Sequence, residues 1–187
     1  MDNNKTTNIN GKILYAGISA GVKNLLEYQD KLDEINVFPV PDGDTGTNMC
    51  FTLLPIIEDC PNEIPEDIDS TINFIASISL DSARGNSGTI IAQFFHGMRK
   101  ALSGNELASI HDFSNALKVG YQSAHDSLLN PEEGTIITVM RDVANKAQEL
   151  IENDSLDFSL FLSECYKEAE QSLQRTKTIL KILEKTD

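Results

Sequence analysis

The sequence predicts an all-α protein, an up-and-down antiparallel barrel or bundle of about eight helices. Apolar residues recur at three- and four-residue spacing along most of the chain, and glycine, proline, asparagine and aspartate fall between those segments. The connections are short, which favours antiparallel neighbours. The 187 residues fit one domain spanning residues 1–187, of which residues 1–8 are expected to be flexible.

The helices can be placed from this periodicity. The first is expected over residues 11–32, where an apolar face runs from Leu14 to Leu25. The second begins near Thr47, and Pro55 is expected to kink or restart it. Further helices are predicted over residues 67–81, 90–102, 112–129, 135–151, 158–173 and 176–184. Residues 89–91 and 135–140 are rich in β-branched side chains and could form strands, but the 3.6-residue period continues past both runs and favours helix.

The composition excludes several classes of function. With 15 Lys and Arg against 29 Asp and Glu, the net charge is -14, which disfavours broad binding of nucleic acid and makes metal cations the natural counter-charge. The polar start lacks an apolar signal core, and no apolar run is long enough to span a bilayer, so we expect a cytoplasmic chain without a transmembrane segment. Cys50, Cys60 and Cys165 form no C-x-x-C pair and are expected to be buried, reduced thiols.

The richest set of oxygen ligands lies in residues 36–48. Asp42 and Asp44 flank Gly43, so an irregular turn can direct both carboxylates toward one hard cation such as Mg²⁺. The polar residues that follow lead into a helix whose free amides can receive phosphate oxygens. An Asx-type turn with a helix N-cap is the alternative interpretation. A calcium-binding EF-hand is excluded because its twelfth position would be Leu53, and the common nucleotide motifs are absent.

Two further helix starts carry glycine with small polar residues, at residues 83–89 and 132–136. Each could be only a cap, but several such N-termini converging would suit a polyphosphate. Arg84 and Arg141 could neutralise phosphate charge during phosphoryl transfer, or could be ordinary salt-bridge partners. The three histidines show no arrangement that supports hydrolase chemistry.

Three segments together resemble one known family. They are NVFPVPDGDTGTNM at residues 36–49, ARGNSGTI at residues 83–90 and EGTIITVMR at residues 133–141. From about Ile9 onward the chain resembles the N-terminal, nucleotide-binding domain of the bacterial fatty acid kinase A subunit, which is similar to the L subunit of dihydroxyacetone (glycerone) kinases. The resemblance implies an all-α barrel that holds ATP and two Mg²⁺ ions in the loops at one end.

The same resemblance implies roles for individual residues. Asp42 and Asp44 would hold Mg²⁺. The dihydroxyacetone kinases carry a further metal-binding aspartate five residues before this motif, where this chain has Val37, so Asn36 would substitute through its amide oxygen. Nucleotide contacts are implied for Thr45, Gly46, Thr47, Asn48, Asn86, Ser87, Gly88, Gly134, Thr135 and Ile136, with the isoleucine packing against the base.

The function implied is transfer of the γ-phosphoryl group of ATP to a fatty acid carboxylate that an acyl-binding partner protein presents. Val37 weighs against the alternative of a dihydroxyacetone-type kinase subunit, and a non-catalytic ATP-sensing module or a purely structural bundle are the rivals from other classes. Members of the family continue into further kinase domains, so this chain is expected to be a fragment that does not turn over alone. Association into a homodimer stays open.

Overall fold

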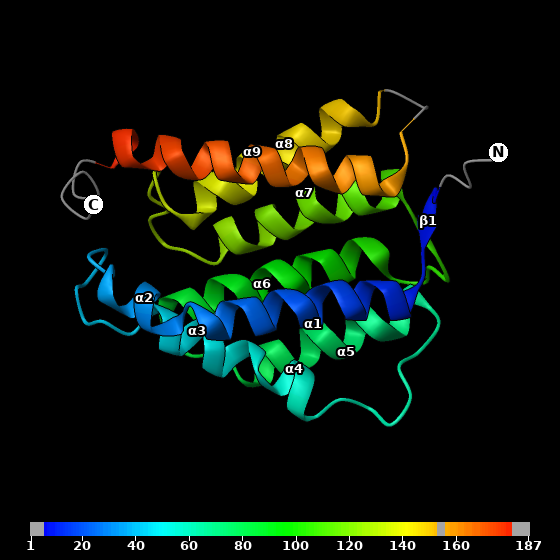
Figure 1. The fold of residues 1–187 in the computed structure, drawn as a ribbon, viewed down its shortest axis with the longest axis horizontal. Coiled ribbons are helices and arrows are strands. Elements are labelled where there is room, and N and C mark those ends of the chain that lie inside the picture. The colour runs from blue at the N-terminus through cyan, green and yellow to red at the C-terminus, as the bar shows by residue number, and fades with distance from the viewer. Residues whose placement is uncertain (1–5, 153–155, 181–187) are drawn as a thin grey trace.

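The computed structural model, which describes residues 6–152 and 156–180, is an all-α helical bundle and confirms the predicted fold class (Figure 1). Its helices are α1 (Gly11–Glu27), α2 (Gln29–Glu34), α3 (Thr45–Leu53), α4 (Pro55–Glu58), α5 (Ile68–Asp81), α6 (Gly85–Leu102), α7 (Ile110–Asp126), α8 (Ile136–Leu150) and α9 (Phe158–Ile179). The strands β1 (Asn8–Ile9) and β2 (Ala108–Ser109) have two residues each. None of the helices in this part of the chain combines the length and apolarity needed to cross a membrane.

Side-chain caps define where most of the long helices begin. Asn10, Asp67 and Asp157 each accept a hydrogen bond from an amide in the first turn of the helix that follows them. Ser109 and Asp112 form a reciprocal capping box at the start of α7. Such caps satisfy amides that have no partner inside the helix, so they fix the first residue of each helix.

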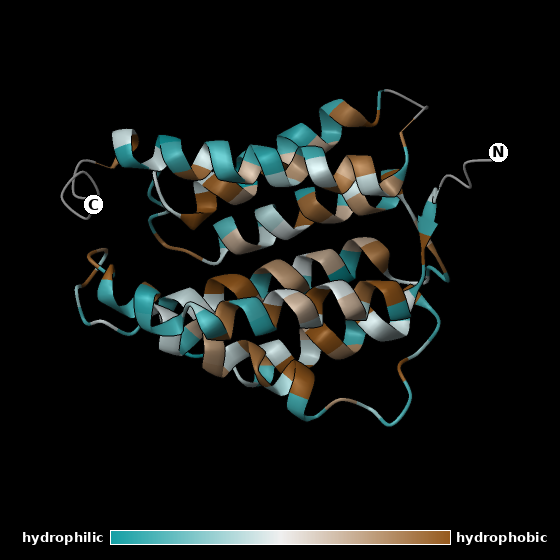
Figure 2. Cartoon of the chain, in the orientation of Figure 1, coloured by the Kyte–Doolittle hydropathy of each residue, from teal (hydrophilic) through white to brown (hydrophobic). Residues whose placement is uncertain are grey.

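The helices pack as successive neighbours. The order is α1, α5, α6, α7, α8 and α9, and α3 contacts α1, α2 and α6. Hydrophobic residues lie largely on faces turned toward neighbouring helices, whereas the short α2 is mostly hydrophilic (Figure 2). Between α7 and α9 the rings of Phe113, Phe158 and Phe161 meet edge to face at centroid distances of 5.5 to 6.4 Å. This apolar packing holds the helices that carry the polar loops.

The two ends of the bundle differ. At one end β1 pairs antiparallel with β2, and the Phe158 amide donates to the Thr6 carbonyl at 2.8 Å. At the other end lie the loop before α3, the α5–α6 turn, the α7–α8 loop and the end of α9 (Figure 1). The three segments with glycine and small polar residues therefore share one end of the molecule.

Some predicted boundaries are wrong. The predicted helix 11–32 is two helices that meet at Tyr28, while the restart at Pro55 is confirmed. Helices α3, α6 and α7 begin earlier than predicted. The predicted break before Thr176 does not exist: α9 continues through this residue to Ile179, with the Thr176 side chain buried and its hydroxyl donating to the Leu173 carbonyl. Residues 181–184 of the last predicted helix lie outside the described residues.

The N-terminal segment and the cysteines can also be compared with the expectations, and among the cysteines Cys60 differs. Residues 1–5, which belong to the segment expected to be flexible, lie outside the described part, and Asn8 pairs with Ser109 in the β1–β2 ladder. Cys50 and Cys165 are buried as predicted, and burial raises the pKa of the Cys165 thiol to about 11. Cys60 is only half-buried, because it lies in the connector after α4 and not on a packed helix face.

Candidate functional site

The loop before α3 is held in shape by Asn36. Its side-chain oxygen accepts a hydrogen bond from the Thr45 hydroxyl at 2.8 Å, and its side-chain nitrogen donates to the Val40 carbonyl at 2.8 Å. The loop also contains a cis peptide bond between Phe38 and Pro39. Gly43 has φ +67°, a backbone conformation that favours glycine. The fold therefore presents Asp42 on the surface and Asp44, half-buried, at the start of α3.

The first turn of α3 is capped from a different helix. Asp44 stands at the N-cap position, yet its side chain makes no capping hydrogen bond. Asp33 of α2 does this instead, because its carboxylate accepts from the Thr47 amide at 3.0 Å and from the Thr47 hydroxyl at 2.6 Å. Partial burial alone would raise the pKa of Asp33, but the hydrogen bonds from Thr47 and Gly46 outweigh it and lower that pKa.

Asp33 is a residue that sequence reasoning missed. It lies in the acidic run of α2, QDKLDE, and nothing in that run distinguishes it from its neighbours. Its partner Thr47 was expected to line the phosphates. In the structure the Thr47 hydroxyl also accepts from the Gln29 side chain at 3.2 Å, so both its amide and its hydroxyl are engaged by α2.

The start of α6 lies directly against α3. The Ser87 hydroxyl donates to the Thr45 carbonyl at 3.2 Å, and the Arg84 amide donates to the Thr52 hydroxyl at 3.2 Å. A Cβ added to Gly88 would lie 2.2 Å from the Thr52 oxygen, so glycine permits this approach. Asn48 is buried beside Gly85, and Asn86 is exposed. The structure thus brings residues 44–48 and 84–88 together, as a shared ligand site requires.

The start of α8 occupies the same end but packs on other elements. Gly134 is buried at φ +84° against Ile179 and Leu180, and Thr135 is the N-cap of α8. Ile136 is half-buried against the small apolar cluster of Ile90, Ala124 and Ile137. These contacts position residues 134–136 through α9 and the α6–α7 pair.

The two arginines have different surroundings. The Arg84 guanidinium is exposed and lies 5.2 Å from the centre of the Phe51 ring, a cation–π contact. Arg141 instead forms ion pairs with Glu133 and Asp142. Burial would lower the pKa of Arg141, but these two carboxylates raise it. The salt-bridge alternative therefore describes Arg141 in this structure.

The donor set at this end can be compared with the needs of a metal ion. Among residues 6–152 and 156–180, no three histidine, cysteine, aspartate or glutamate side chains gather as a metal cluster. An ion held here would use Asp42, Asp44 and neutral oxygens. That set fits Mg²⁺, which is commonly bound by one or two carboxylates together with phosphate oxygens and water.

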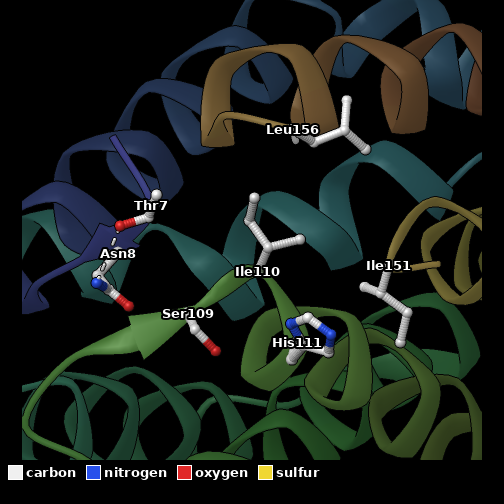
Figure 3. Close-up of a pocket in the computed structure, with 7 residues that line it drawn as sticks. All are labelled: Thr7, Asn8, Ser109, Ile110, His111, Ile151 and Leu156. Carbon is white, nitrogen blue, oxygen red and sulfur yellow. Dashed lines mark hydrogen bonds between the residues drawn. The ribbon is translucent and has the colours of Figure 1, made fainter. Parts of the chain in front are cut away.

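A cavity of about 180 Å³ lies at the opposite end of the bundle, beside the paired strands β1 and β2, the start of α7 and the residues that follow α8 and precede α9 (Figure 3). It is lined by Thr7, Asn8, Ser109, Ile110, His111, Ile151 and Leu156. None of the predicted site residues borders it. The candidate site is therefore the set of open loops at the other end, where a ligand would be held by backbone amides and short polar side chains.

Comparison with known proteins assigns the family. Residues 39–186 match the DAK2 domain. The chain belongs to the DAK2 domain family. Relatives include an uncharacterized protein of Staphylococcus saprophyticus, 37% identical over 177 residues, and Protein YloV of Bacillus subtilis, 36% identical over 175 residues. Both alignments cover 94% of this chain but 32% of the relative, so this DAK2 domain chain spans about a third of their length. The family supports a dihydroxyacetone-kinase-like nucleotide-binding module.

Proposed function

We propose that this domain binds ATP with Mg²⁺ at the loop end of the bundle and is the nucleotide-binding part of a kinase. The observation that carries the proposal is that Asp44, at the N-cap position of α3, makes no capping hydrogen bond. Asp67 and Asp157 occupy equivalent N-cap positions and use their carboxylates to cap the helix. Asp44 does not, because Asp33 has taken over that task. Its carboxylate is thereby left available, next to the exposed Asp42, for a cation.

Two helix starts supply the complementary surface for phosphate. The N-termini of α3 and α6 meet through the Ser87–Thr45 hydrogen bond. Amides at a helix N-terminus favour anions. Because Asp33 already compensates part of the α3 terminus, a bare phosphate would meet nearby negative charge. Mg²⁺ bound to Asp42 and Asp44 would remove that repulsion, so ATP binding should depend on the metal.

For the acceptor, we propose a fatty acid carboxylate presented by an acyl-binding partner. In that reaction the bond between the γ-phosphorus of ATP and its bridging oxygen breaks, a carboxylate oxygen takes the phosphoryl group, and ADP leaves. The task of this domain is to hold ATP in a fixed orientation, and positioning accounts for much of the rate in phosphoryl transfer. The close match of residues 36–49 to the fatty acid kinase motif and the presence of Val37 support this acceptor over a small hydroxyketone.

Calorimetric titration with ATP, with and without Mg²⁺, tests the nucleotide site. We expect Mg²⁺-dependent binding by the wild-type chain, and loss of at least about tenfold in affinity for an Asp42→Asn, Asp44→Asn double variant, since charge-assisted interactions are worth roughly 1.5–3 kcal/mol each. The matched control is Asp59→Asn, Glu63→Gln, which removes the same charge from the exposed connector after α4. Equal ATP affinities of the two double variants would contradict the proposal.

A second experiment separates a kinase from an ATP sensor. The chain is mixed with the remaining domains of a full-length relative and with an acyl-loaded carrier protein. A kinase domain should restore acyl phosphate formation, and the Asp42→Asn, Asp44→Asn variant should not. Binding of ATP without any restored transfer would favour the sensing module.

A further inference from the structure

Arg141 lies at the centre of a polar network that joins the loop before α8 to helix α9. On one side its guanidinium contacts Glu133, and on the other its Nε and Nη2 donate to Asp142 at 3.2 and 3.1 Å. The Arg141 side chain is 33% exposed and that of Asp142 is 16% exposed. The Arg141–Asp142 pair is therefore more shielded from solvent than most surface ion pairs, and its contribution to stability is larger than theirs.

The Glu133 side of the network ends on the backbone at the start of α8. The second carboxylate oxygen of Glu133 accepts from the Thr138 hydroxyl at 2.7 Å. That hydroxyl oxygen accepts in turn from the Gly134 amide at 2.8 Å. Arg141, Glu133, Thr138 and Gly134 thus form a continuous chain of hydrogen bonds. Its last member is the buried glycine that leads into Thr135 and Ile136.

The Asp142 side of the network is anchored on α9. Its carboxylate accepts from the Ser172 hydroxyl at 2.7 Å and from Arg175 at 2.8 Å. Burial would raise the pKa of Asp142, but the hydrogen bonds from Arg175, Ser172 and Arg141 lower it. Arg175 also pairs with Glu168 at 2.6 Å. Asp142 is thus held as an anion, and Arg141 is fixed between two carboxylates.

We infer that Arg141 is a positioning residue, which fixes the backbone of residues 134–136 through Glu133 for a nucleotide bound at the loop end. This inference rests on the proposed function for the identity of the ligand. A transition-state cation would have to leave both carboxylates before it could reach a phosphate. The hydrogen-bond chain gives Arg141 a different task, in which its charge is used to hold Glu133 in place.

Two variants distinguish a positioning role of Arg141 from direct contact with phosphate, because the two roles predict opposite changes in ATP affinity for one of them. If Arg141 positions the loop, Arg141→Met should weaken Mg²⁺-dependent ATP binding by about tenfold, and Glu133→Gln should weaken it as well, because both cut the same chain of bonds. The double variant should then be little weaker than Arg141→Met alone. If Arg141 acts on phosphate directly, Glu133→Gln frees the guanidinium, so unchanged or tighter binding in that variant overturns the inference.

A second readout does not need the nucleotide. Amide hydrogen exchange in the ATP-free protein should be faster at Gly134 and through residues 135–138 in both variants, and Arg141→Lys should restore part of the protection. Lys146→Met, Glu149→Gln removes an ion pair farther along the same helix, between half-buried Lys146 and exposed Glu149, and should leave these amides unchanged. Unchanged exchange in Arg141→Met overturns the inference even if ATP binds. Conversely, failure of the wild-type chain to bind ATP counts against the proposed function, while the exchange data still decide the positioning role.

Discussion

At the start of α3, one aspartate occupies the N-cap position and another accepts the capping hydrogen bond. In most helices a single residue does both. Asp33 neutralises the first turn of α3 from outside, through the amide and hydroxyl of Thr47. Asp44 occupies the N-cap position, but its side chain accepts no hydrogen bond from the first turn. The cap of the first turn of α3 therefore comes from α2, and the Asp44 carboxylate takes no part in it.

The stabilising part of this arrangement can be tested through its dependence on pH. We expect Asp33→Ala to lower the free energy of unfolding by about 1 kcal/mol at pH 7, a usual value for the loss of a helix cap. The folded-state pKa of Asp33 is lowered. Its contribution is therefore present above the unfolded-state pKa of about 3.9 and is lost as the pH falls through the lower folded-state value.

Urea denaturation of both proteins between neutral and acid pH measures this difference. The gap between wild type and variant should close at the acid end. Asp30→Ala, on the same helix but exposed, serves as the control. A gap that stays constant through the acid range would mean that the Asp33 carboxylate charge does not stabilise α3.

At this scale the sequence predicted the candidate ligands but not their supports. Asp42, Asp44 and the glycines stand out because their residue types and spacing are unusual for a plain loop. Asp33 and the Arg141–Glu133 pair do not stand out, since acidic and basic residues on helix surfaces are common. Their roles depend on which helix lies opposite, and that is decided by tertiary packing.

At the scale of helices, glycines serve opposite purposes in different places. At Gly46 an added Cβ would lie 2.3 Å from the Gln29 carbonyl oxygen, and at Gly88 it would lie 2.2 Å from the Thr52 hydroxyl. These glycines set the distances of α3 from α2 and α6. At Gly17 and Gly21 of α1, nothing lies within 4 Å of an added Cβ. There, no close approach requires glycine, which only lowers the helix propensity.

Alanine substitutions should therefore have opposite signs. Gly17→Ala is expected to stabilise the protein by up to about 1 kcal/mol, the difference in helix propensity. Gly88→Ala should destabilise it by roughly 1–3 kcal/mol, the usual cost of overpacking. Chemical denaturation of the two single variants checks both values. Stabilisation by Gly88→Ala would show that α3 and α6 can separate without cost.

The helices themselves could largely be predicted, because most are long and carry an apolar face with a regular period. Boundaries were less certain. Thr45 and Gly85 read as loop residues by type, yet both lie in the first turn of a helix. The strands β1 and β2 carry no signal of their own, since two residues are too few to show a period, and their pairing joins segments about a hundred residues apart.

At the scale of the whole molecule, the dominant property is the net charge of -14. Like charges at this density repel one another and destabilise the compact state, and salt screens that repulsion. Several of the ion pairs are exposed, as with Lys31–Glu34 and Lys12–Glu66, and contribute little. Salt should therefore stabilise the folded state by weakening the net repulsion more than it destabilises that state by weakening the ion pairs.

We accordingly expect the melting temperature to rise when NaCl is increased from about 0.01 M to about 0.15 M, which shortens the Debye length from about 30 Å to about 8 Å. Differential scanning calorimetry provides the measurement, and choline chloride at the same ionic strength is the control for specific cation binding. A fall in melting temperature would mean that attractive ion pairs outweigh the net repulsion.

The unlike ends of the bundle also decide where a label can be attached. The chain enters at the end held by β1 and β2, whereas α9 finishes at the opposite end, where Ile179 and Leu180 contact Gly134 (Figure 1). An affinity tag or fluorophore joined ahead of β1 is remote from the polar loops. The same group joined after α9 would sit beside them, and could report ligand binding or obstruct it.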